Sequence, residues 1–168
     1  MRTLQKKVCL LGDFAVGKTS LIRRFVEGRF DDKYLSTIGV KISRKSFTRD
    51  EHLLNLLIWD LAGGDDFSKA GSSYLRGAAG ALVVCDLSRQ ETLAPLEYYA
   101  SQLRAVHETA VLVFIGNKAD LVDEQEISVD ELAAIAQTFS ASFLLTSALS
   151  GSNVAAAFDC LAQQIEAQ

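Results

Sequence analysis

The segment Gly12-Asp13-Phe14-Ala15-Val16-Gly17-Lys18-Thr19 lies between an apolar run, residues 8–11, and a stretch with helical spacing of apolar residues that begins at Leu21. It fits the pattern G-x-x-x-x-G-K-[S/T] of a phosphate-binding loop. Free N–H groups and the dipole at a helix N-terminus attract anions. A tight glycine turn with a solvated lysine is the plainer interpretation, but the flanking strand and helix favour a nucleotide site.

Each residue type in this loop has an expected task. The Lys18 ammonium should reach the β- and γ-phosphates, and the Thr19 hydroxyl should bind Mg²⁺. The other residues expected to line the nucleotide here are Asp13, Phe14, Ala15, Val16, Gly17 and Ser20.

The hydrophobic pattern around the loop predicts an α/β protein. Residues 8–11, 81–85 and 111–115 are unbroken apolar runs, as expected for parallel strands covered on both faces. Segments 40–48 and 53–59 predict a hairpin, which gives one antiparallel pair at the sheet edge. Helices are predicted after a capping box at Ser128, over the last segment, and from Thr92 with Pro95 in the first turn.

Composition excludes several functions. The 168 residues suit a single domain spanning 1–168, and the net charge of −4 argues against a nucleic-acid-binding protein. No apolar run is long enough to span a membrane. The three cysteines are far apart and without metal-ligand spacing, as expected for reduced thiols of a cytoplasmic protein.

Two further segments indicate which base is bound. Asn117-Lys118-Ala119-Asp120 follows the strand at 111–115, and Thr146-Ser147-Ala148 ends a later one. Ligands in such sheets lie at the carboxyl ends of the strands. A carboxylate at Asp120 can accept hydrogen bonds from guanine N1–H and the 2-amino group, which adenine lacks on that edge. Asp60, at the end of the hairpin, is placed to hold Mg²⁺ through water, and the Gly63 amide to reach the γ-phosphate.

In order along the chain, five segments resemble the nucleotide-binding motifs of Ras-like small GTPases. They are 12–19, Thr37-Ile38-Gly39, Trp59-Asp60-x-Ala62-Gly63, Asn117-Lys118-x-Asp120 and Thr146-Ser147-Ala148. Ser72-Ser73-Tyr74-Leu75-Arg76-Gly77-Ala78 looks most like the Rab branch. The resemblance covers nearly the whole chain.

The resemblance implies a three-layer P-loop NTPase fold with a six-stranded, mostly parallel sheet, one antiparallel edge strand and about five helices. It implies GTP or GDP bound with Mg²⁺. Thr37 would bind Mg²⁺ and γ-phosphate in the first switch, and Phe30 would pack against guanine. The catalytic residues would be Lys18, Thr37, Gly63 and Gly64. The base pocket would be formed by Asp120 together with Lys118, Ser147 and Ala148.

The same resemblance implies protein partners. An effector would bind at Ile42, Trp59 and Tyr74, although ordinary packing explains Trp59 and Tyr74 almost as well. An exchange factor and an activator are also implied. Relatives that are recruited to membranes end in a lipidated tail; this chain ends at Gln168 after the last helix, so either the protein acts without a membrane anchor or a tail is missing from the sequence.

Three positions depart from the family pattern. The family usually has Gln, which orients the attacking water, where this chain has Gly64, and a small residue where it has Phe14. Leu149 replaces a Lys whose stem covers the base, and Leu can pack there as well. We expect intact nucleotide binding with slow GTP hydrolysis. A scaffold that holds GTP without hydrolysing it is the alternative. A small-molecule kinase or ATPase is less favoured, because no segment supplies an acceptor lid or a catalytic carboxylate.

Overall fold

The computed structural model describes residues 1–28 and 40–168. The strands of this part of the chain are β1 (Arg2–Leu11), β2 (Val40–Thr48), β3 (His52–Leu61), β4 (Ala78–Asp86), β5 (Val111–Asn117) and β6 (Ser142–Leu145). The α-helices are α1 (Lys18–Glu27), α2 (Gly64–Tyr74), α3 (Pro95–Val106), α4 (Val129–Thr138) and α5 (Val154–Glu166). Two short 3₁₀ turns, Gln90–Thr92 and Val122–Glu124, precede α3 and α4.

All six described strands form one sheet in the order β2-β3-β1-β4-β5-β6. β2 pairs with β3 in an antiparallel hairpin at one edge, and every other pairing is parallel. The predicted α/β class, the six-stranded sheet with its antiparallel edge, and the five helices are therefore confirmed. Strand order reverses at β1, so the segments that follow β1 and β4 diverge to opposite faces of the sheet and leave a crevice for a ligand.

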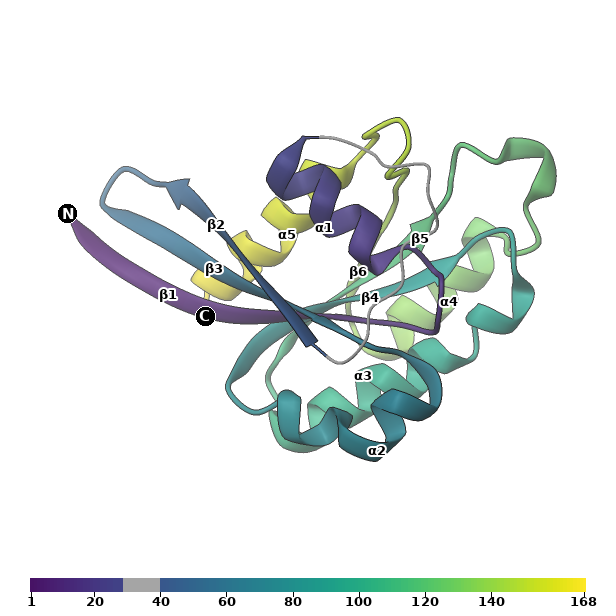
Figure 1. The fold of residues 1–168 in the computed structure, drawn as a ribbon, viewed down its shortest axis with the longest axis horizontal. Coiled ribbons are helices and arrows are strands. Elements are labelled where there is room, and N and C mark those ends of the chain that lie inside the picture. The colour runs from purple at the N-terminus through teal and green to yellow at the C-terminus, as the bar shows by residue number, and fades with distance from the viewer. Residues whose placement is uncertain (29–39) are drawn as a thin grey trace.

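Helices cover both faces of the sheet, which gives three layers (Figure 1). On one face, buried residues of α1 and α5 such as Leu21 and Phe158 pack on alternate residues of the strands. On the other face, residues of α2, α3 and α4 such as Phe67, Leu103 and Leu132 pack on the remaining ones. β4 and β5 are buried over nearly their whole length, which explains why they appear in the sequence as unbroken apolar runs. None of the helices in the described ranges combines the length and the hydrophobicity needed to cross a bilayer.

β3, β4 and β5 extend one to three residues beyond their predicted ends, and the starts of β1 and α3 also differ from the sequence prediction. β1 begins at Arg2, six residues before the apolar run, because it pairs with β3 from Arg2 opposite His52 onwards. This end of the sheet extends beyond the helices (Figure 1), so polar side chains are tolerated there. The regular helix α3 begins at Pro95 and not at Thr92. A proline costs least at the first helical position, and the preceding residues form a 3₁₀ turn instead.

A charged cluster fastens the hairpin to the last helix. Arg49, in the turn between β2 and β3, donates to Glu166 of α5 at 2.7 Å, and His52 Nε2 lies 2.7 Å from the other carboxylate oxygen. Hydrogen bonding from Arg49 lowers the pKa of Glu166, so the carboxylate stays charged well below neutral pH. The cluster fixes the far end of β3, whose other end carries Asp60.

Candidate functional site

The loops that follow β1, β3, β4, β5 and β6 meet along one edge of the sheet, as expected where parallel strands share a direction (Figure 1). The predicted phosphate-binding loop lies between β1 and α1, at the centre of this edge. Its helix begins at Lys18, with Gly17 as the N-cap in the left-handed conformation at φ 106°. A Cβ at Gly17 would collide with the Asn117 amide nitrogen, so only glycine fits.

Lys18 lies folded across the loop. Its side-chain nitrogen donates to the Gly12 carbonyl at 2.8 Å and to the Asp13 carbonyl at 3.0 Å, and the residue is only 6% exposed. Burial lowers the pKa of Lys18 to about 8, although the Asp60 and Asp13 carboxylates oppose the shift. The ammonium therefore remains the main form at neutral pH. A buried cation at the start of a helix is well suited to a phosphate group.

Thr19 and Asp60 form a candidate magnesium site. The Thr19 hydroxyl donates to Asp60 Oδ2 at 2.6 Å, which brings a hydroxyl and a carboxylate together beside Lys18. Within the described residues, no group of three or more His, Cys, Asp or Glu side chains could hold a metal by itself. This donor set fits Mg²⁺, which typically takes one or two protein oxygens and completes its octahedron with substrate phosphates and water.

Asn117 joins the phosphate-binding loop to the two segments predicted to bind the base. Its amide nitrogen donates to the Val16 carbonyl at 3.0 Å, and its amide oxygen accepts from the Thr146 hydroxyl at 3.0 Å. Asn117 and Thr146 are almost completely buried, so both bonds are shielded from water. One side chain thus fixes the positions of three loops that lie far apart in the sequence.

Asp120 lies beside Ser147 at the same edge. The Ser147 hydroxyl donates to Asp120 Oδ1 at 2.7 Å, and the Ala119 amide donates to the Thr146 carbonyl at 2.9 Å. The bond from Ser147 fixes the orientation of the Asp120 carboxylate, and an ionised carboxylate can only accept hydrogen bonds. The Asp120 carboxylate is therefore an oriented acceptor in the loop after β5, as a guanine-selective site requires.

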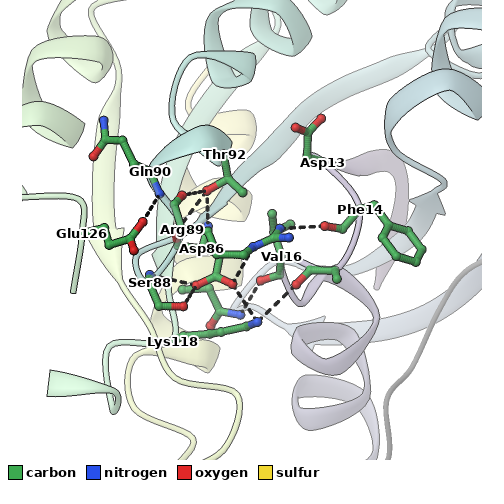
Figure 2. Close-up of polar contacts among 12 residues, drawn as sticks. Asp13, Phe14, Val16, Asp86, Ser88, Arg89, Gln90, Thr92, Lys118 and Glu126 are labelled. Atoms are coloured by element: carbon green, nitrogen blue, oxygen red, sulfur yellow. Dashed lines mark hydrogen bonds and ion pairs between the residues drawn. The ribbon is translucent and has the colours of Figure 1, made fainter. Parts of the chain in front are cut away.

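A buried carboxylate organises the side chains that support the phosphate-binding loop (Figure 2). Asp86, at the end of β4, pairs with Lys118 at 2.7 Å and with Arg89 at 3.2 Å. Lys118 also donates to the Ala15 carbonyl at 3.2 Å, and Arg89 to the Phe14 carbonyl at 2.8 Å.

Together with Asn117, this network holds the carbonyl oxygens of three consecutive loop residues, 14, 15 and 16. Burial alone would raise the pKa of Asp86, but hydrogen bonds from Lys118 and Ser88 outweigh it. The pKa of Asp86 therefore lies below its ordinary value, so Asp86 remains a carboxylate and can pair with both cations.

The segment predicted to be the second switch begins against the phosphate-binding loop. Gly63, the N-cap of α2, lies so close to the phosphate-binding loop that a Cβ there would collide with the Gly12 carbonyl oxygen. The next residue, Gly64, donates its amide proton to the Tyr99 hydroxyl at 2.9 Å, and that hydroxyl donates to Asp13 at 2.8 Å. The Phe14 ring is 57% exposed and points away from the supporting network (Figure 2).

The predicted effector residues lie next to one another. Ile42 of β2 is opposite Trp59 of β3, and the Trp59 ring lies 6.3 Å from that of Tyr74. Ile42 is 51% exposed, whereas Trp59 and Tyr74 are half-buried against the core. Lys7 also lies over the Trp59 ring, 3.7 Å from its centroid. The trio is a continuous patch, but both aromatic residues also serve packing.

Of the residues predicted for the site, Phe30 and Thr37 lie outside the described part of the chain. Ala148 is buried in the core on the α1 and α5 face of the sheet, and the next residue, Leu149, is 53% exposed. Sequence reasoning missed Asp86, Arg89 and Tyr99. Asp86 ends an apolar strand just as Asp60 does, which was a usable signal. Tyr99 occupies the apolar face of its helix, so nothing in the sequence distinguishes it from a core residue.

Comparison with known proteins agrees with this geometry. The family model described as the Ras family matches residues 7–167. The chain is 39% identical over 160 residues to Ras-related protein RABA5a of Arabidopsis thaliana, covering 95% of this chain and 72% of the relative. It is 36% identical over 160 residues to Ras-related protein Rab-11C of Dictyostelium discoideum, covering 95% and 71% respectively.

The chain therefore belongs to the Ras family. It is a Ras-like small GTPase of the Rab branch, a class of small GTP-binding switch proteins.

Proposed function

We propose that this protein binds GTP and GDP with Mg²⁺, hydrolyses GTP slowly and signals through two switch loops. The observation that carries the proposal is the bonding of Asn117, whose amide contacts both Val16 and Thr146. Because one buried side chain fixes the phosphate-binding loop against the base-side loops, a single nucleotide can occupy both. Residues 1–168 would form one domain around it, and the reduced cysteines suit a cytoplasmic protein.

The residues would divide the work as follows. Lys18 would bind the β- and γ-phosphates, and the Gly63 amide the γ-phosphate. Thr19, Asp60 and Thr37 would hold Mg²⁺, which neutralises charge on the phosphate oxygens when bound. Asp120 would accept from guanine, and Leu149 would pack on the base. Ser20, next to Thr19 on α1, would add a backbone amide for the phosphates.

Hydrolysis should be slow because two features oppose it. Gly64 has no side chain to orient the attacking water, and the exposed Phe14 ring would crowd the path by which an activator's arginine enters. Transfer of a phosphoryl group to water depends on positioning and charge stabilisation. The missing side chain at position 64 would therefore lower the intrinsic rate, and the ring at position 14 would mainly weaken acceleration by an activator. The same two residues favour the alternative function, a scaffold that stays bound to GTP.

A single-turnover assay separates these functions. Protein loaded with radiolabelled GTP and Mg²⁺ is followed without any partner. We expect turnover below the intrinsic rate of Ras, about 3–5 × 10⁻⁴ per second. Turnover at that rate would contradict slow hydrolysis, and no turnover over several days would establish the scaffold. GTP recovered from freshly purified protein would agree with either; GDP would favour the hydrolase.

We also propose that the patch of Ile42, Trp59 and Tyr74 binds an effector. Its support is the exposure of Ile42 and the contact of Trp59 with Tyr74, the last residue of α2, a helix whose first turn the γ-phosphate would order. An exchange factor and an activator would act on the adjoining loops. The identity of such partners is a question for affinity capture with GTP-bound and GDP-bound protein.

Replacing Arg89 with Met should accelerate nucleotide release. The change removes the bond to the Phe14 carbonyl and one partner of Asp86, while Lys118 keeps Asp86 paired. The Arg89 side chain is about one-third exposed, so the expected effect is modest, roughly three- to tenfold. The measurement is release of fluorescent GDP into excess unlabelled GDP.

Arg104→Met is the matched control for this prediction. Arg104 also donates to a backbone carbonyl, that of Ala110, but it lies in the last turn of α3. Its replacement should leave release unchanged. Equal release rates for wild type and Arg89→Met would show that Arg89 does not support the loop.

A further inference from the structure

The Tyr99 hydroxyl connects three elements at the edge of the nucleotide site. Tyr99 lies on α3, donates to Asp13 Oδ1 at 2.8 Å and accepts from the Gly64 amide at 2.9 Å. Asp13 belongs to the phosphate-binding loop, and Gly64 is the first residue of α2. One hydroxyl therefore links the loop that would hold the phosphates to the segment that would respond to them.

The surroundings of Tyr99 keep this bridge in place. The residue is 2% exposed, and its ring packs edge-on against Phe67 of α2 with centroids 4.9 Å apart. Burial raises the pKa of Tyr99, so the phenol stays protonated. A neutral phenol can donate and accept at once, as the bridge requires, whereas a phenolate could only accept.

The position of the bridge indicates which step it affects. Gly63, directly before Gly64, would contact only the γ-phosphate, and it already lies against the Gly12 carbonyl and Asp13. A segment that is held before the ligand binds loses less conformational freedom on binding. GDP has no γ-phosphate and would gain nothing from this order.

We propose that Tyr99 is a positioning residue that holds the Gly63–Gly64 segment beside the phosphate-binding loop and thereby favours the nucleoside triphosphate over the diphosphate. This inference rests on the proposed function. It assigns to a buried residue of α3 control over the GTP-to-GDP affinity ratio. Because Gly64 has no side chain that could hold this segment, the hydrogen bond from its backbone amide to Tyr99 of α3 supplies the order instead.

The test uses Tyr99→Phe, which removes only the hydroxyl and keeps the ring that packs on Phe67. Affinities for GDP and for the non-hydrolysable analogue GMP-PNP are measured with Mg²⁺. We expect analogue affinity to fall about three- to tenfold while GDP affinity stays within twofold of wild type. A purely structural defect would weaken both nucleotides alike, so the ratio separates the two explanations.

Tyr98→Phe is the matched control. Tyr98 is the neighbouring residue on α3, is 43% exposed, and packs against the same Phe67 ring. Its loss of a hydroxyl should leave the ratio unchanged. In protein that also carries Asp13→Ala, the effect of Tyr99→Phe should largely disappear, because the bridge has then lost its anchor.

Hydrogen exchange of the Gly64 amide provides a second readout in the GDP-bound protein. Wild type should protect this amide, and Tyr99→Phe should exchange it about three- to tenfold faster. An unchanged affinity ratio, an equal loss for both nucleotides, or a gain for the analogue would overturn the role of Tyr99. Failure of the proposed function would look different: wild type itself would bind neither nucleotide.

Discussion

Replacing Asp120 with Asn should lower the affinity for GDP by about 100- to 1,000-fold. A carboxylate offers two acceptor oxygens to the N1–H and 2-amino donors of guanine. The carboxamide keeps one acceptor and turns an N–H₂ donor toward a guanine donor. Ser147 orients Asp120 through a 2.7 Å bond and would hold the amide in the same place, so the mismatch could not be avoided by rotation alone. Competition against fluorescent GDP measures the loss.

The chain offers a close control for this variant. Asp123 is exposed on the next turn, and Asp123→Asn makes the same chemical change away from the loop cluster. It should bind GDP as wild type does. The Asp120 variant should also bind xanthosine diphosphate better than GDP, since xanthine presents an acceptor where guanine has the 2-amino group. Unchanged GDP affinity would remove Asp120 from the base site.

Combining Gly64→Gln with Phe14→Ser should raise single-turnover hydrolysis about tenfold or more, toward the intrinsic rate of Ras. Glutamine supplies a group that orients water, and serine clears the γ-phosphate side of the loop. Space is available, because nothing lies within 4 Å of a Cβ built at Gly64. The backbone there has φ 63°, however, so a side chain costs roughly 1 kcal/mol unless this peptide rotates.

Gly64→Ala separates these contributions. It imposes the same backbone restriction without a group that can hold water, so it should not hydrolyse GTP faster than wild type. Phe14→Ser alone should have a small effect on the intrinsic rate, because it only opens the γ-phosphate side of the loop to an activator and adds no group that orients water. If the double variant hydrolyses GTP no faster than wild type, then residues 14 and 64 do not limit turnover.

The sequence predicts the fold well where a segment is buried, because burial requires apolar residues and these form a recognisable pattern. β4 and β5 are covered on both faces, so their sequences are continuously apolar and unambiguous. The first six residues of β1 lie where the sheet extends beyond its helices, and polar residues there hide the strand. The start of α3 was misplaced because a 3₁₀ turn and the first turn of an α-helix have similar local sequence signals.

The candidate site could be predicted where chemistry depends on local sequence order. The loop at 12–19 and the segment at 117–120 carry their residues at fixed spacing next to a strand. The bridge from Asp13 through Tyr99 to Gly64 depends instead on how α3 packs against α2. Likewise, Arg89 supports the Phe14 carbonyl from a position 75 residues away in the sequence. Such contacts arise from tertiary structure and leave no local pattern.

The most direct measurement for the whole account is calorimetric titration of nucleotide-free protein with GDP and with ADP, each with Mg²⁺. An oriented carboxylate at position 120 and a buried ammonium at position 18 should give tight binding of GDP. ADP should bind at least 1,000-fold more weakly, since it leaves the base-side acceptor without a donor. Equal affinity for the two nucleotides, or binding of neither, would contradict the account.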